Sequence, residues 1–209
     1  MVTERPFLER PAIIPIGEWV LEGLWHRGDS LPPLLIVPPP PEQGGMDHPV
    51  LAEIAWASAR AGFPTLRFNF RGTGASQGKR GGDRERLADA EASLRVLEEN
   101  TGVARVAVCS LGGSAPAIIE LQRLHPGISG LCFVSPVAIP SPDLSRIAVP
   151  LLAIVGEGDR SIAPAALAAA ISEAGGRMEI IPGADAHFHS GLPEVGKSVV
   201  RWLAELGDV

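Results

Sequence analysis

The chain has 209 residues, of which 45% are hydrophobic and 20% charged, as expected for a globular protein that can bury a core without disulfides or metals. Its net charge of −6 and the lack of a Lys- or Arg-rich run exclude nucleic acid as an expected partner. Two cysteines, Cys109 and Cys132, are too few for a disulfide framework and are predicted to be buried free thiols.

Targeting and membrane signals are missing from the printed sequence. The first ten residues carry charges of both signs and contain no apolar stretch typical of a signal peptide. No run of 18 apolar residues is present, so no transmembrane segment is predicted. We therefore expect a soluble, cytoplasmic protein with no membrane partner, and no pattern indicates its oligomeric state.

The first predicted elements are a hairpin and a short buried strand. Residues 12–26 have the pattern of two strands with a turn near Gly17, and Leu34 to Val37 form the next predicted strand. Four prolines, Pro38 to Pro41, follow at once. Proline has no backbone N–H for the ladder, so the chain is expected to leave the sheet at this point.

Helices and strands alternate beyond the prolines. Helical spacing of apolar side chains predicts most of the helices, and Asp83 is the predicted N-cap of the second. In chain order, we predict a helix over 47–61, a strand over 65–70, a helix over 83–100, a strand over 103–109, a helix over 111–124, strands over 128–134 and 150–155, a helix over 164–174, a strand over 178–181 and a helix over 192–206.

This alternation predicts an α/β fold, with a mostly parallel, doubly wound sheet, an antiparallel N-terminal edge and helices on both faces. We expect one domain over residues 1–209, with a core from about 12 to 206. The longest irregular stretch, residues 135–148, is too short to form a cap domain.

Ligands bind at the carboxyl ends of the strands in such a sheet, so polar residues that follow strands are the site candidates. Ser110 follows the strand predicted to end at Cys109, and the next helix is predicted to begin at Leu111. A strand that turns into a helix across one residue strains that residue and points its side chain out of the sheet edge. Ser110 is therefore the candidate nucleophile, and the N–H groups from Leu111 onward are candidate oxyanion donors.

Two further strands are followed by candidate partners for Ser110. Asp159 can orient an imidazole, although it can equally cap the turn before the helix at Pro164, and Glu157 is a competing carboxylate nearer the strand. His187 and His189 stand in the loop after the last strand, and histidine is the natural general base near neutral pH. A His-x-His pair is also found in metal sites, but no further cluster completes one, so no metal or cofactor is predicted.

The chain order Ser110, Asp159, His187 is that of an α/β-hydrolase triad. In such a triad the serine attacks a carbonyl, the histidine moves the proton, and the aspartate orients the imidazole. A second oxyanion donor is expected in the loop after the strand at Leu34. The first backbone N–H groups beyond the prolines there belong to Glu42 and Gln43.

A glycine-rich loop follows the strand predicted over 65–70. Its glycines fall at Gly72, Gly74 and Gly78, a spacing that fits neither the Walker nor the Rossmann phosphate motif. We interpret it as a structured loop at a strand end, with Arg71 held in an ion pair.

The sequence resembles the α/β-hydrolase superfamily, and more closely the small, lidless bacterial group related to dienelactone hydrolases and serine-peptidase-like esterases. The resemblance covers roughly residues 34–206 and is carried by residues 68–78, 109–113, 156–159 and 182–188. It implies a serine hydrolase with His187 as the base, because a His-Phe pair follows the Gly-Ala-Asp turn in the relatives. His189 is the alternative base.

Three functions remain open. The first is a serine hydrolase that cleaves a small carboxylic ester or thioester through an acyl-enzyme on Ser110. The second is a non-catalytic α/β-hydrolase-fold binding protein, because relatives usually have a small residue where Val108 stands, two positions before the nucleophile, and because prolines fill the oxyanion loop. The third is a peptidase or acyltransferase on the same triad, since pocket shape decides the substrate.

Overall fold

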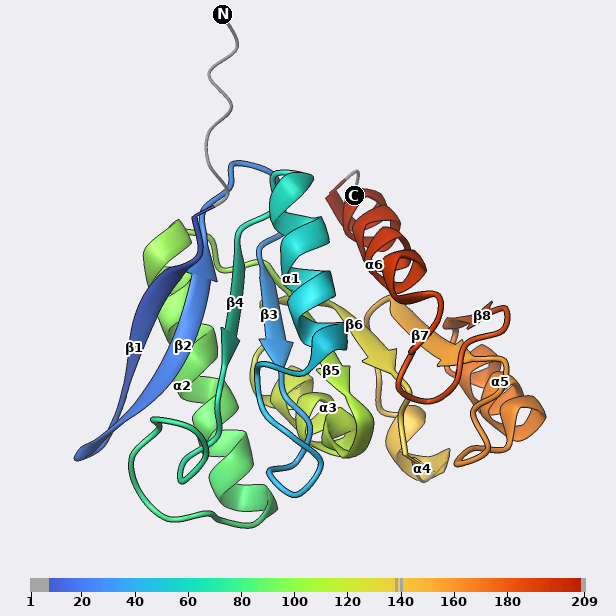
Figure 1. Cartoon of the computed structure of the whole chain (residues 1–209), viewed down its shortest axis with the longest axis horizontal. Coiled ribbons are helices and arrows are strands. Elements are labelled where there is room, and N and C mark those ends of the chain that lie inside the picture. The colour runs from blue at the N-terminus through green and yellow to red at the C-terminus, as the bar shows by residue number, and fades with distance from the viewer. Residues whose placement is uncertain (1–7, 138, 140, 208–209) are drawn as a thin grey trace, which may run out of the picture.

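The computed structural model describes residues 8–137, 139 and 141–207. Its strands form one eight-stranded sheet in the order β1-β2-β4-β3-β5-β6-β7-β8 (Figure 1). The strands are β1 (Arg10–Ile16), β2 (Trp19–His26), β3 (Leu34–Val37), β4 (Thr65–Phe68), β5 (Val106–Leu111), β6 (Ile128–Val134), β7 (Leu151–Gly156) and β8 (Arg177–Ile181). The first two pairings, β1 with β2 and β2 with β4, are antiparallel, and all the others are parallel.

Helices connect the parallel strands. They are α1 (Pro49–Arg60), α2 (Asp83–Thr101), the short 3-10 helix η1 (Gly112–Ser114), α3 (Ala115–Leu124), α4 (Ser141–Leu144), α5 (Pro164–Glu173) and α6 (Leu192–Gly207). The predicted fold class is thus confirmed. Among the residues that the structure describes, no helix is long and apolar enough to cross a bilayer.

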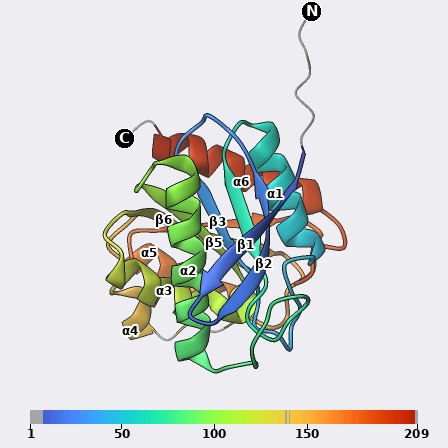
Figure 2. The ribbon, with the colours of Figure 1, turned by 90° about the vertical axis from the view of Figure 1, so that its left-hand side faces the viewer.

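Two apolar layers hold the helices against the sheet. Helices α1 and α6 cover one face, and α2, α3 and α5 cover the other (Figure 2). Successive side chains of a strand point to opposite faces. In β5, Val106 and Val108 accordingly pack on the α2/α3 side, whereas Ala107, Cys109 and Leu111 pack on the α1/α6 side. This alternation decides where each side chain near the end of β5 can point.

Most predicted element boundaries agree with the structure, and the differences have local causes. Helix α2 has Gly82 rather than Asp83 as its N-cap, because the Glu85 carboxylate accepts a hydrogen bond from the Gly82 backbone N–H (2.9 Å). The short helix α4 was not predicted. It is the only helix among the described residues between β6 and β7, and a four-residue helix is no cap domain.

The thiols of Cys109 and Cys132 are both free and buried, as predicted. They lie in register on neighbouring strands β5 and β6. Burial raises the pKa of Cys132 well above its ordinary value. This thiol is therefore protonated and inert near neutral pH.

A buried ion pair fixes the loop that follows β4. Asp89 on α2 is 0% exposed and accepts three hydrogen bonds from Arg71, one from the backbone N–H (2.9 Å) and two from the guanidinium (2.8 and 2.6 Å). The expectation that Arg71 is held in an ion pair is therefore confirmed.

Replacing Asp89 by Ala should lower the free energy of unfolding by about 3–5 kcal/mol, because it leaves the Arg71 guanidinium without its counter-charge. Urea denaturation measures the loss. Asp83→Ala on the same helix is the matched control. Asp83 is 93% exposed and paired with Arg86, so its removal should cost about 1 kcal/mol or less. Equal losses in the two variants would contradict a structural role for the buried pair.

Candidate ligand pocket

The turn from strand β5 into the following helix falls at Gly112. The ladder between β5 and β6 continues through Leu111, which lies in register with Val134, and η1 begins at the next residue. Gly112 has a φ of +60°, a conformation that costs side-chain-bearing residues free energy and that glycine adopts freely. The strained strand-to-helix residue is thus Gly112. The prediction that Ser110 stands at this turn, and that the helix begins at Leu111, is wrong.

Ser110 lies inside strand β5, in register with Val37 on one side and Phe133 on the other. The alternation of the strand gives its side chain the same direction as those of Val106 and Val108, toward the α2/α3 face. Ser110 is 1% exposed, and its hydroxyl has no hydrogen-bond partner among the described residues. The structure therefore does not bring the Ser110 hydroxyl together with Asp159 or a histidine.

The sequence around the turn has the spacing of a nucleophile elbow when it is centred on Gly112. The elbow pattern G-x-S-x-G has small residues two positions before and two positions after the nucleophile. Ser110 and Ser114 are the small residues at these positions relative to Gly112. In this register the nucleophile position of the elbow pattern falls on Gly112, which has no side chain. The bulk of Val108 is then unremarkable, since it is an ordinary core residue of the strand.

The carboxamide of Gln43 covers this turn. Its Oε1 accepts a hydrogen bond from the backbone N–H of Gly113 (3.1 Å), and a Cβ built on Gly112 would lie 2.7 Å from the same oxygen. The backbone N–H of Gln43 donates a hydrogen bond to the Pro40 carbonyl (2.7 Å). It is therefore already paired, and the prediction that it serves as an oxyanion donor is wrong. Glu42 is exposed. Gln43 therefore contributes to the site through its side chain.

The proline segment forms a wall beside the turn. Pro38 to Pro40 are buried, and the Ser114 hydroxyl donates to the Pro38 carbonyl (2.7 Å). The absence of N–H groups in this segment is thus compatible with close packing, because its carbonyls still accept hydrogen bonds from neighbouring groups.

Asp159 follows β7 in the chain, and its carboxylate accepts hydrogen bonds from two serines. It is 4% exposed, and its Oδ2 accepts a hydrogen bond from the Ser135 hydroxyl (3.0 Å). Its Oδ1 accepts from the backbone N–H (2.8 Å) and the hydroxyl (2.6 Å) of Ser161. In the described part of the chain, no histidine hydrogen bonds with this carboxylate, so the predicted Asp–His contact is not formed.

The rings of the two predicted histidines lie 5.7 Å apart, centroid to centroid, but of the two only His187 is among the described residues that line the cavity at Gly112. His189 is largely exposed, and its Nδ1 contacts Asp185 Oδ2 (2.7 Å). That contact, together with backbone hydrogen bonds, lowers the pKa of Asp185 to about 2. The intervening Phe188 is buried and has a φ of +53°, which turns the chain between the two histidines. Of the two histidines predicted as the base, His187 is therefore the one that lines this cavity.

A further histidine, His48, is part of the site and was not predicted from the sequence. Its ring centroid lies 6.4 Å from that of His187. His48 is the N-cap of α1, and its Nδ1 accepts a hydrogen bond from the Val50 N–H (3.3 Å). Burial, and secondly the neighbouring His187, lower the pKa of His48 below 6.5. His48 is therefore neutral at pH 7, and since Nδ1 is an acceptor, the proton is on Nε2.

These groups surround a cavity of about 210 Å³ at the carboxyl ends of the parallel strands. Its walls combine apolar surface with a few polar side chains, as ligand pockets do. It is lined by Pro39, Gln43, His48, Leu111, Gly112, Ser135, Val137, Ser161, Ala186 and His187. Among the residues that the structure describes, no three His, Cys, Asp or Glu side chains are grouped as a metal site would require.

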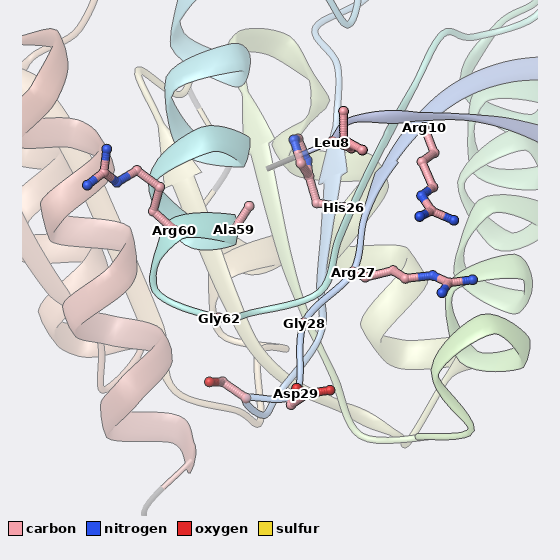
Figure 3. Close-up of a pocket in the computed structure, with 10 residues that line it drawn as sticks. Leu8, Arg10, His26, Arg27, Gly28, Asp29, Ala59, Arg60 and Gly62 are labelled. Atoms are coloured by element: carbon pink, nitrogen blue, oxygen red, sulfur yellow. The ribbon is translucent and has the colours of Figure 1, made fainter. Parts of the chain in front are cut away.

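A larger hollow, of about 710 Å³, lies at the opposite end of the sheet (Figure 3). Arg10 and Arg27 extend to one side of it and Arg60 to the other, so the guanidinium groups do not converge on a common point. The Arg60 guanidinium lies over the ring of Trp56, 4.8 Å from its centroid. His26 is turned inward, where its Nδ1 contacts the Thr65 hydroxyl (3.1 Å). The smaller cavity is therefore the better candidate site.

Comparison with known proteins agrees with this architecture. No protein-family model matches the chain, and no curated protein matches it either. An α/β serine hydrolase homologue from Coxiella burnetii is 24% identical, over 93% of this chain and 97% of that chain, with a TM-score of 0.80. A putative α/β hydrolase of unknown function from Agrobacterium tumefaciens is 22% identical (94% and 95% covered, TM-score 0.82).

A third similar structure, a lidless α/β serine hydrolase from Xanthomonas campestris, is 19% identical (95% and 96% covered, TM-score 0.79). At these identities the similarity extends to the fold. The chain therefore has the α/β-hydrolase fold, in the compact form without a lid. The solved structures with which it shares that fold include hydrolases and esterases.

The pKa of His48 provides a test of the pocket geometry. In an NMR titration, His48 should titrate below 6.5, and His187→Ala should raise its pKa without reaching 6.5, because burial is the larger cause. The pKa of His26, which burial also lowers, should not respond and is the internal control.

The same shift links stability to pH. The folded chain binds fewer protons than the unfolded chain between the two pKa values of His48, so the free energy of unfolding should decrease as the pH falls through 6.5. A His48 that titrates at or above 6.5, or that ignores His187→Ala, would contradict the described geometry.

Proposed function

We propose that this chain is a non-catalytic α/β-hydrolase-fold protein that binds a small, uncharged molecule in the cavity at Gly112. The observation that carries the proposal is the glycine at the strained strand-to-helix turn, where a serine hydrolase needs its hydroxyl. Without a side chain at this position, no acyl-enzyme can form there.

The other hydroxyls of the cavity do not replace the missing one. Ser135 and Ser161 both donate their hydroxyl protons to Asp159. Neither of them hydrogen bonds with a histidine in the described ranges, and a serine nucleophile needs such a base to accept its proton. The cavity therefore supports binding better than acyl transfer.

Size and charge restrict the ligand. A volume of about 210 Å³ is below the roughly 300–1,000 Å³ of pockets for drug-sized ligands, so the ligand is small. The buried Asp159 carboxylate contacts two residues of the lining, Ser135 and Ser161, and its negative charge disfavours an anion in the cavity. A small neutral molecule fits both conditions.

The competing function is hydrolysis of a small ester or thioester through Ser110, Asp159 and His187. It is favoured by the fold shared with hydrolases and esterases and by the presence of His187 in the cavity. For this function Ser110 would have to leave the core of strand β5. The two functions differ in whether a reactive serine exists.

A fluorophosphonate probe distinguishes them. We expect the wild-type protein neither to be labelled nor to hydrolyse p-nitrophenyl acetate above the buffer rate. Ser110→Ala should leave both results unchanged and the protein as stable as before, or more stable by up to about 1 kcal/mol, because the buried hydroxyl that it removes has no partner. Labelling that maps to Ser110 and disappears in Ser110→Ala would overturn the proposal in favour of the triad.

Restoring the missing hydroxyl tests the position of the elbow. Gly112→Ser combined with Gln43→Ala, which removes the carboxamide oxygen from the space of the new side chain, should gain fluorophosphonate labelling at residue 112, because His187 lines the same cavity. The labelling rate is measured against Gln43→Ala alone. A folded double variant that stays unlabelled would contradict the assignment of Gly112 to the nucleophile position.

A further inference from the structure

We propose that the cavity takes a small neutral carboxamide, and that the side chain of Gln43 is its built-in competitor, placing an amide oxygen on the Gly113 N–H until the ligand displaces it. This inference rests on the proposed binding function and names its ligand class and a residue that sets its affinity. It starts from the one amide group that already lies at the cavity.

The Gln43 carboxamide occupies the position that a ligand carbonyl would take. Its Oε1 accepts the hydrogen bond of the Gly113 N–H (3.1 Å), and it lies over Gly112, in the space that the absent side chain leaves open. The chain thus presents to this N–H an amide carbonyl of its own. A ligand with the same group can replace it without leaving the donor unsatisfied.

Displacement of Gln43 is easy for two reasons. The residue is exposed, so its side chain can move into solvent. Among the described residues, its carboxamide makes one hydrogen bond, the one with the Gly113 N–H. The affinity lost to this competition is therefore that of about one hydrogen bond.

The other polar groups of the cavity match both ends of an amide. His48 is neutral with its proton on Nε2, so it adds a second donor for a carbonyl oxygen. The hydroxyl groups of Ser135 and Ser161 donate hydrogen bonds to Asp159, so toward a ligand their oxygens can only accept a hydrogen bond. A carboxamide supplies an acceptor oxygen and N–H donors together.

Related carbonyl compounds fit less well. An ester has the acceptor oxygen but no N–H for the serine oxygens. A carboxylate lacks the donor and carries a negative charge next to the buried Asp159. A volume of about 210 Å³ suits a short aliphatic chain on the amide.

The experiment is a titration of the ¹⁵N-labelled full chain with propionamide, sodium propionate and methyl propionate, followed by amide NMR resonances. Three proteins are compared: wild type, Gln43→Ala and the matched control Gln77→Ala. Gln77 also accepts a backbone hydrogen bond through Oε1, from the Val20 N–H (3.2 Å), but it lies outside the cavity.

We expect propionamide to bind all three proteins and to bind Gln43→Ala about twofold to tenfold more tightly than wild type or Gln77→Ala, the equivalent of one hydrogen bond. The Gly113 amide resonance should move in Gln43→Ala and move back when propionamide is added. Propionate and methyl propionate should bind at least about tenfold more weakly than propionamide, since each lacks a required donor.

The possible failures are distinguishable. Equal propionamide affinities in wild type and Gln43→Ala, or a Gly113 resonance that ignores the ligand, would overturn the role of Gln43 while leaving the binding function in place. Tighter binding of propionate or methyl propionate would overturn the ligand class alone. Fluorophosphonate labelling of wild type at Ser110 would overturn the proposed function itself, and no binding of any of the three compounds would overturn the inference.

Discussion

The positive φ of Gly112 is the constraint on which the rest of the site depends. It turns the chain directly after Leu111, the last residue of strand β5, and thereby sets which face of the sheet every β5 side chain meets. Because side chains alternate along a strand, Ser110 then lies on the same side as Val108, inside the core. A shift of the turn by two residues would place Ser110 at the sheet edge, but the ladder with β6 continues past it.

The polar groups around the cavity satisfy one another in place of the contacts of a triad. Asp159 takes its hydrogen bonds from two serines, His48 caps α1, and the Gly113 N–H is held by Gln43. Each of these contacts would compete with the alignment that acyl transfer needs, in which the histidine bridges the carboxylate and the nucleophile. Such a cavity is suited to a ligand that replaces one of these internal hydrogen bonds with one of its own, as an amide could at the Gly113 N–H.

Most of the fold follows from patterns that a sequence displays. The apolar runs at Leu34–Val37 and Ile128–Val134 match β3 and β6 residue for residue, because buried strands of a parallel sheet need continuous apolar surface. The predicted turn falls two residues too early, because Ser110-Leu111-Gly112-Gly113 allows either residue 110 or residue 112 at the bend. Val108 was the available signal, since a bulky residue two positions before a supposed nucleophile indicates a different register.

Gln43 and His48 were harder to anticipate as side chains of the site, because both depend on the path of the loop between β3 and α1. That path depends on contacts far apart in the chain, such as the Ser114 hydroxyl on the Pro38 carbonyl. The same loop explains why two catalytic features are absent together. Its prolines cannot supply a second oxyanion donor, and the Gly113 donor that remains is held by the Gln43 carboxamide, which lies where a side chain at position 112 would begin. A hydroxyl at residue 112 and the observed position of Gln43 exclude each other, so the glycine and the glutamine are parts of one arrangement.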